Sequence, residues 1–278
     1  MAPQELPGPV LLFCPADRPE RYAKAFAAAD GVILDLEDGV GADGKDAARA
    51  ALVAALASGA VDLTRVIVRV NATGTPEHAA DLTALRETGC RLIMLPKTET
   101  RAQVDGLDGD WRVVALCETA LGVVNAAEIA AASNVIAVMW GAEDLIASMG
   151  GRTSRFPDGR YRDVALHARS AVLLAASAYG RPAIDAVYVN IPDLDGLAAE
   201  AEDAAASGFA LKACIHPSQV AVVAAAFRAD EAQVTWARRV IAAARDAGAR
   251  DKGAIKVDGQ MVDAPLIRQA EAILSSLR

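Results

Sequence analysis

Eight short apolar runs alternate with helical segments along this chain, and this alternation constrains its fold more than any other feature. Each run is rich in Val, Ile and Leu. Such runs are typical of parallel strands that are covered on both faces. They occupy residues 9–14, 31–36, 65–70, 91–96, 112–117, 134–140, 183–189 and 210–215.

The segments between the runs are Ala-rich and amphipathic, as expected of helices that pack on a sheet. Thr75, Pro76 and Glu77 form a typical helix start, and Asp193 precedes a helix that should stop at Gly208. Eight strand–helix units over about 230 residues predict an α/β fold, a (β/α)8 TIM barrel. An open doubly wound sheet would carry a glycine-rich turn after its first strand, where this chain has CPADRPER. The predicted helices cover 17–29, 44–57, 76–87, 99–106, 122–132, 162–179 and 194–206.

The barrel is predicted to span residues 1–230, with residues 231–278 as a C-terminal extension. A helix is expected over 231–249, followed by an extended segment or hairpin over 252–263 and a final helix after Pro265. Barrel closure does not require this extension. It is therefore predicted to act as a lid or as an arm between subunits.

Charge and composition restrict the partners of the protein. The net charge of −8 argues against nucleic acid or an anionic membrane as the main partner. No apolar run approaches the ~18 residues that a membrane helix needs, and the N-terminus lacks a signal-peptide pattern. We therefore expect a cytoplasmic protein that binds small molecules. Its four cysteines form no C-x-x-C pair and are predicted to be reduced and buried.

The active site of such a barrel lies at the C-terminal ends of its strands, and these ends are dense in ionisable groups. Converging carboxylates attract a hard divalent cation such as Mg2+. An arginine beside them suits a substrate carboxylate or a developing oxyanion. A plain network of ion pairs is the alternative interpretation. The residues at the strand ends are Pro15, Asp17, Arg18, Glu37, Asp38, Arg69, Asn71, Lys97, Glu99, Glu118, Thr119, Glu143, Asp144, Asn190 and His216.

A set of motifs spread over residues 11–270 occurs in the order of a known family. The motifs are LLFCPADRPERYAKA, VILDLEDGV, VIVRVN, LIMLPKTE, ALCETALGVVNAAEIA, WGAEDL, IDAVYVNIPDLDGLAAEAEDAAASGFALKACIHPSQV and GQMVDAPLIRQA. With them the sequence resembles the HpcH/HpaI aldolase/citrate lyase family, in its citrate lyase beta-subunit-like branch. The resemblance implies a (β/α)8 barrel that forms a homotrimer or hexamer and uses Mg2+, with Mn2+ as an alternative ion.

The resemblance also implies roles for individual residues. Glu118 of CET and Asp144 of GAED are the implied metal ligands, although ordinary ion pairs would also explain them. Arg69 of VRVN is implied to contact the substrate carboxylate and the reacting carbonyl, and it could also bridge to Glu37. Asp263 of MVD is the implied acid/base, supplied to a neighbouring subunit, with capping of the following helix as its other possible role.

Coenzyme A is implied as part of the substrate. Arg21 and Lys24 match positions that help to hold its phosphates. His216 is better explained as a structural or cofactor-adjacent residue than as a catalytic one. The chain departs from the family at Ala16, where glycine is usual, and its loop over 150–163 is a variable region that leaves the substrate open.

The implied reaction is the reversible Claisen-type cleavage of a 3-hydroxy-3-carboxyacyl-CoA to acetyl-CoA and a 2-oxo acid. Citramalyl-, malyl- and citryl-CoA are the implied substrates. Mg2+ would polarise the forming carbonyl, Arg69 would stabilise the enolate oxygen, and Asp263 would protonate the enolate carbon. Three alternatives are a malate synthase-like condensation of acetyl-CoA with glyoxylate, a CoA-independent hydroxy-oxo-acid aldolase, and a subunit of a multi-subunit citrate lyase.

The stretch GVILDLEDGV crowds three carboxylates at the end of one predicted strand. Side-chain alternation places Asp35 and Glu37 on one face and Asp38 on the other. Glu37 is predicted to belong to the catalytic set by orienting Arg69 or Lys97.

Asp38 and Lys97 are predicted to contact the substrate or cofactor. Lys45 and Arg49, one helical turn apart in the next helix, are expected to balance the charge of the three carboxylates.

Overall fold

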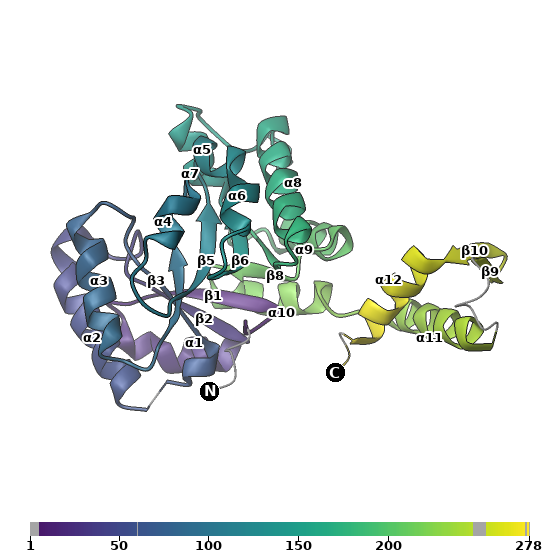
Figure 1. Cartoon of the computed structure of the whole chain (residues 1–278), viewed down its shortest axis with the longest axis horizontal. Helices are drawn as coiled ribbons and strands as arrows, with labels where there is room; N and C mark the ends of the chain where they lie inside the picture. The colour runs from purple at the N-terminus through teal and green to yellow at the C-terminus, as the bar shows by residue number, and fades with distance from the viewer. Residues whose placement is uncertain (1–5, 60, 247–253, 276, 278) are drawn as a thin grey trace. The chain divides into compact units, whose positions relative to one another are not determined.

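A closed barrel of eight parallel strands forms the larger part of the computed structural model, which describes residues 6–59, 61–246, 254–275 and 277 (Figure 1). Each strand pairs with the next, and β1 pairs with β8 to close the ring. The predicted (β/α)8 barrel is confirmed. Its strands are β1 (Val10–Pro15), β2 (Gly31–Asp35), β3 (Val66–Arg69), β4 (Leu92–Leu95), β5 (Arg112–Cys117), β6 (Val135–Trp140), β7 (Ala183–Asp185) and β8 (Leu211–Cys214).

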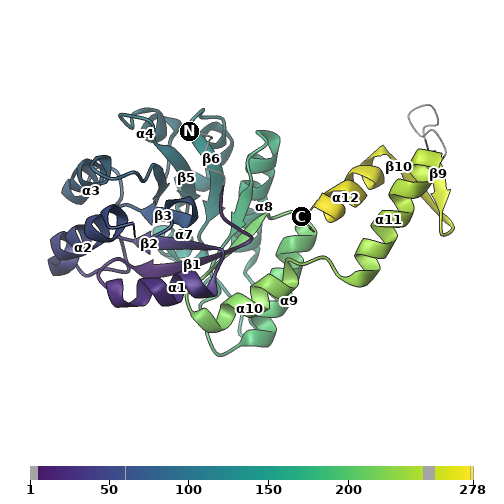
Figure 2. The same cartoon turned by 90° about the horizontal axis from the view of Figure 1, so that it is seen from below.

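Helices surround the strands on the outside of the barrel (Figures 1 and 2). Thr75 starts α3 by accepting a hydrogen bond from the His78 backbone, and Asp193 starts α9 in the same way. The helices and 3-10 turns are η1 (Pro19–Arg21), α1 (Tyr22–Ala28), η2 (Ala42–Gly44), α2 (Lys45–Ala57), η3 (Leu63–Arg65), α3 (Pro76–Arg86), α4 (Arg101–Asp105), α5 (Ala120–Val124), α6 (Ala126–Ala130), α7 (Ala142–Ser148), α8 (Asp163–Ala178), α9 (Leu194–Ser207) and α10 (Pro217–Ala226).

Alternate side chains of the strands point inward and fill the barrel. Leu11, Ile33, Ile67 and Leu92 are fully buried members of this core. Such side-chain layers make the barrel interior a packed core instead of a channel. The chemistry must therefore occur above the top layer, at the C-terminal ends of the strands.

Strand β7 is shorter than the predicted 183–189. It leaves the ladder after Asp185, and the carbonyl of Ala186 accepts a hydrogen bond from Lys212 Nζ at 2.8 Å. The Lys212 side chain thus supplies the hydrogen bond that a neighbouring strand would otherwise donate to this carbonyl.

The chain forms two compact units, Met1–Ala224 and Ala225–Arg278, called here the first and second unit. The sequence placed the boundary between residues 230 and 231, and the predicted helix end at 247–249 and the hairpin start at 252–253 lie outside the described residues. The second unit contains α11 (Glu231–Asp246), β9 (Ala254–Val257), β10 (Gln260–Asp263) and α12 (Ala264–Ser275).

The second unit has a core of its own. Ala237, Val240, Val257, Val262 and Ala270 are buried together where α11, the hairpin and α12 meet. Strands β9 and β10 pair antiparallel, as the extended or hairpin segment predicted. Their turn has positive φ at two successive residues, 258 and 259, a geometry that matches the twist of paired strands.

None of the helices in the described part of the chain has the length and apolarity needed to cross a bilayer. All four cysteines are free and buried. Burial raises the pKa of Cys117 to about 12, so this thiol stays protonated and unreactive.

Candidate active site

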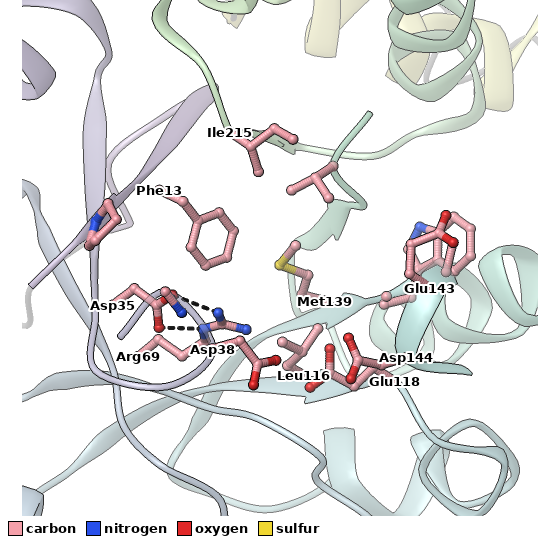
Figure 3. A pocket seen from close by; sticks show the side chains of 16 residues that line it. Phe13, Asp35, Asp38, Arg69, Leu116, Glu118, Met139, Glu143, Asp144 and Ile215 are labelled. Atoms are coloured by element: carbon pink, nitrogen blue, oxygen red, sulfur yellow. Dashed lines mark hydrogen bonds and ion pairs between the residues drawn. The ribbon is translucent and has the colours of Figure 1, made fainter. Parts of the chain in front are cut away.

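A cavity of about 370 Å3 opens at the C-terminal ends of the barrel strands (Figure 3). Parallel strands bring their final residues to the same edge, which is why side chains from distant parts of the sequence meet there. The charged residues that line the cavity are Asp35, Asp38, Arg69, Glu118, Glu143 and Asp144.

Arg69 and Asp35 form a bidentate ion pair in this cavity. They are register partners at the ends of β3 and β2, so their side chains enter the barrel at the same level. Arg69 Nε and Nη2 donate to the two Asp35 carboxylate oxygens at 2.7 Å each. The sequence predicted Glu37 as the partner of Arg69; Glu37 Oε2 does lie 2.9 Å from Arg69 Nη1, but Asp35 makes the two parallel bonds. Together the two carboxylates fix the guanidinium plane.

Glu37 connects Arg69 to Lys97. Lys97 Nζ donates to Glu37 Oε1 at 2.5 Å and lies 3.6 Å from Asp38 and 3.7 Å from Asp144. Burial alone would lower the pKa of Lys97, but the hydrogen bond and charge of Glu37 raise it, so the amino group stays protonated. Lys97 has a φ of 48°, in the left-handed region that residues other than glycine rarely adopt. Such backbone strain is concentrated at functional sites.

Glu118 and Asp144 approach each other from two neighbouring strand ends. Glu118 directly follows β5 and is only 3% exposed, whereas Asp144 lies in the first turn of α7 and is half exposed. The Lys97 backbone N–H donates to Glu118 Oε1 at 3.0 Å. A Cβ atom at Gly141 would come within 2.8 Å of Glu118 Oε2, so only glycine lets this carboxylate lie against the α7 turn.

These two carboxylates fit a hard divalent cation. Burial, and then the charges of Asp144 and Glu37, raise the pKa of Glu118 to about 8. A bound cation would stabilise the charged carboxylate and so offset both the cost of its burial and the repulsion from Asp144 and Glu37. No group of three or more acidic, histidine or cysteine side chains could hold a metal within the described ranges. The protein would therefore supply two ligands and leave the other positions to water and substrate, as Mg2+ sites commonly do.

Lys45 supports the turn that carries Glu37. Its Nζ donates to the carbonyls of Leu36 and Glu37 at 2.7 and 2.6 Å and to Asn71 Oδ1 at 2.8 Å. Lys45 was predicted to balance the charge of the carboxylates after β2; its hydrogen bonds instead go to two backbone carbonyls and to Asn71. It also ties that turn to the end of β3.

The matching prediction for Arg49 is wrong. Its guanidinium pairs with Asp46, Glu77 and Asp81 on α2 and α3 instead of the carboxylates after β2. The fully buried Asp81 also accepts hydrogen bonds from the backbone and side chain of Asn71, both at 2.8 Å. Sequence reasoning missed Asp81, because nothing in the periodicity of α3 marks it as buried.

Other predicted residues lie elsewhere in the fold. Arg21 and Lys24 are exposed on η1 and α1 and do not line the cavity. Asp263 ends β10 in the second unit, directly before α12. His216 Nδ1 lies 2.8 Å from the Ser218 hydroxyl at the start of α10, in agreement with a structural interpretation.

A second buried charge cluster, which the sequence did not predict, lies behind β6, β7 and β8. Asp185 and Lys212 are both fully buried and joined at 2.8 Å. Asp185 also accepts hydrogen bonds from Arg169 Nε at 2.9 Å and from Trp140 Nε1 at 2.7 Å. Trp140 ends β6, so the cluster fixes the strand that leads into the α7 turn.

The segment 150–163, called here the outer loop, is joined to this cluster. Arg155 pairs with Glu200 at 2.8 Å and stacks over Tyr161 and Tyr188, while Glu200 also contacts Lys212 at 3.0 Å. The neighbouring Ser154 hydroxyl donates to Glu143 Oε1 at 2.6 Å. The outer loop is therefore held both at the cavity edge and at the buried cluster.

Comparison with known proteins places this geometry among lyases. Residues 10–217 match the HpcH/HpaI aldolase/citrate lyase family. A citrate lyase subunit beta-like protein of Mycobacterium tuberculosis is 55% identical over 267 residues, which cover 96% of this chain and 94% of the relative.

Two solved structures from Mycobacterium tuberculosis are similar. The protein CitE in complex with magnesium, acetoacetate and coenzyme A has a TM-score of 0.89 and 55% identity, with 97% of each chain covered. A citrate lyase beta subunit complexed with oxaloacetate and magnesium has a TM-score of 0.77 and 58% identity, covering 80% of this chain and 98% of the other.

Proposed function

Because this chain belongs to the HpcH/HpaI aldolase/citrate lyase family of carbon–carbon lyases, we propose that it is a Mg2+-dependent acyl-CoA lyase. Its reaction is the reversible cleavage of a 3-hydroxy-3-carboxyacyl-CoA to acetyl-CoA and a 2-oxo acid. One observation carries this proposal: a single cavity holds the doubly paired Arg69 and, across from it, the carboxylates Glu118 and Asp144 (Figure 3).

Arg69 binds the substrate carboxylate and the oxygen that gains charge as the bond between carbons 2 and 3 breaks. Its orientation is set before substrate arrives, because Asp35 accepts two of its hydrogen bonds and Glu37 forms an ion pair with it. Preorganised donors of this kind stabilise developing charge without reorganisation during the reaction. Lys97, beside Glu37 and Asp38, offsets part of the negative charge on this side of the cavity.

Glu118 and Asp144 hold the metal ion. When bound, Mg2+ supplies Lewis-acid polarisation of the substrate oxygens. The magnesium in both mycobacterial structures supports this assignment, and coenzyme A in one of them supports a thioester substrate. Arg21 and Lys24, exposed near the start of the chain, hold the phosphates of coenzyme A.

The proton balance needs one further group. Cleavage releases the proton of the carbon-3 hydroxyl to water in the cavity and adds a proton to carbon 2 of the acetyl-CoA enolate, so no net proton is consumed. Asp263 gives the proton to the enolate carbon, or removes it in the condensing direction. It does so in a neighbouring subunit of a homotrimer or hexamer.

The test of the proposed function is a coupled assay of acetyl-CoA release. The purified protein is given citramalyl-, malyl- and citryl-CoA, each with Mg2+ and with excess chelator. At least one thioester should be cleaved to acetyl-CoA and a 2-oxo acid, and chelation should abolish the activity. A protein that cleaves none of them with Mg2+ present contradicts the proposal.

Exchange of Asp263 between subunits can be tested by complementation. Asp263→Ala should lower turnover by roughly 10²-fold or more, because the acid/base is lost. Mixing it with Glu118→Gln under conditions of subunit exchange should restore activity. Some sites then contain Glu118 from one subunit and Asp263 from the other. Native mass spectrometry verifies that mixed oligomers form; mixed oligomers without activity would exclude action between subunits.

Mg2+ binding should strengthen as the pH rises to about 8. The pKa of Glu118 is raised to about 8, so at pH 6 the metal must displace a proton from this carboxyl. Affinity is expected to increase by a factor on the order of 50 between pH 6 and 8. Titration calorimetry in two buffers of different ionisation enthalpy measures the affinity and the released proton, and an affinity independent of pH would contradict this assignment.

The ligands of the relatives leave one feature of the substrate open. Acetoacetate carries one carboxylate and oxaloacetate carries two. They therefore do not decide which group occupies the last position on carbon 3 of the substrate of this chain.

A further inference from the structure

We propose that carbon 3 of the substrate carries an uncharged substituent, a hydrogen or a small alkyl group, and not an arm with a second carboxylate. This inference rests on the proposed lyase function and narrows its substrate class. The oxo acid that the enzyme releases is then a 2-oxo monocarboxylate.

The first observation is the apolar half of the cavity. Phe13, Met139, Val187 and Ile215 line it, from strands β1 and β6 and from the segments after β7 and β8. Figure 3 shows Phe13, Met139 and Ile215 on the side of the cavity away from Asp38 and Glu118. Met139 belongs to the buried barrel core, and Phe13 and Val187 pack against that core. A carboxylate that faced this wall would lose its hydration without gaining a partner.

The second observation is the limited capacity of Arg69. A guanidinium has five N–H groups. Asp35 takes two of them and Glu37 lies against a third. The ring of Phe13, 5.0 Å away, lies under the guanidinium. The remaining N–H groups, one on Nη2 and those on Nη1 beside Glu37, suffice for one bidentate substrate carboxylate but not for two.

A second carboxylate would be best served by a second cation. Among the described residues that line the cavity, Arg69 is the one cation. The nearby Lys97 ammonium is already shared by Glu37, Asp38 and Asp144. A second carboxylate on the charged side would therefore face carboxylates instead of free cations, and like charges repel.

Because carbon 3 is tetrahedral, these observations predict a selection rule for its fourth substituent. Its carboxylate and hydroxyl lie on the charged side, with Arg69, Glu118 and Asp144. The thioester arm must leave toward coenzyme A. The fourth substituent is left to the apolar half, where hydrogen or methyl fits and a carboxymethyl group does not.

Steady-state kinetics with Mg2+ test the rule on the wild-type protein. Malyl-, citramalyl- and citryl-CoA differ on carbon 3 by hydrogen, methyl and carboxymethyl. We expect kcat/KM for citryl-CoA to be lower by roughly 10²-fold or more than for the better of the other two. A value for citryl-CoA within tenfold of the best substrate would overturn the inference and leave the lyase function standing. Absence of cleavage with all three would remove the proposed function itself, and the inference with it.

Val187 offers a matched pair of variants. Val187→Lys adds a cation to the apolar half, and Val187→Met adds length without charge. The lysine variant should raise the ratio of citryl-CoA to citramalyl-CoA activity by roughly tenfold or more, while the methionine variant keeps a ratio near that of the wild type. Equal ratios in two folded variants, verified by circular dichroism, would overturn the charge argument. The wild-type ratio decides the selection rule even if the lysine variant does not fold.

Discussion

Replacing Glu118 with glutamine is expected to lower the Mg2+-dependent cleavage rate by roughly 10³-fold, because one of the two proposed metal ligands loses its charge. Glutamine keeps the size of the side chain and an oxygen that can accept the hydrogen bond from the Lys97 backbone. Acetyl-CoA release with saturating Mg2+ measures the effect. The exposed Glu128 on α6 provides the control, since Glu128→Gln should leave the rate unchanged. Full activity in Glu118→Gln would exclude the metal assignment.

The same substitution should not destabilise the metal-free protein. The pKa of Glu118 rises from an ordinary 4.5 to about 8 in the fold. Any stability that comes from this group is therefore present below pH 4.5 and is lost as the pH rises through 8. Glutamine stays uncharged at every pH, so the variant does not lose this stability. The thermal midpoint of the metal-free variant at pH 8 should therefore equal or exceed that of the wild type. Loss of activity with an unchanged midpoint separates a metal defect from misfolding.

Asp185→Asn should lower the free energy of unfolding by about 3–5 kcal/mol, the usual cost of leaving buried charges without their partner. The variant leaves the fully buried Lys212 and the buried Arg169 without the carboxylate that they share. In the wild type, these two cations keep the pKa of Asp185 low in spite of its burial. Urea unfolding followed by circular dichroism measures the change.

Asp203 is the control for this experiment. It pairs with the same Arg169, but its side chain is 61% exposed. Asp203→Asn should therefore cost less than ~1 kcal/mol. Equal destabilisation by the two variants would show that burial does not decide the strength of this cluster.

The barrel could be predicted from sequence because each strand lies in a short run dominated by apolar residues. The same reasoning found Arg69, Glu118 and Asp144, since residues that follow such runs must gather at one edge. It could not identify which of the nearby carboxylates forms the bidentate ion pair with Arg69. Asp35 is the bidentate partner because its Cα is in register with Arg69, and register between strands is not visible in one sequence.

The second buried cluster was missed for a different reason. Asp185 and Lys212 each interrupt an apolar run, and a single charged residue in such a run was not interpreted as buried. The signal was present: two opposite charges occupy neighbouring strands at outward-facing positions. Arg49 shows a different error. It was predicted to pair with the carboxylates after β2 because it is close to them in sequence, but it pairs with Asp81 on α3.

The outer loop has a consequence for enzyme engineering. Its attachments come from two adjacent residues, Ser154 and Arg155, and from Tyr161 after the turn. The turn between them, residues 156–160, closes on itself through the Phe156 and Arg160 backbones. Directed-evolution libraries confined to this turn would vary a loop that is anchored to the lining residue Glu143 through Ser154, and they would leave the anchors, Glu118 and Asp144 unchanged. The turn can therefore be varied separately from the residues that line the cavity.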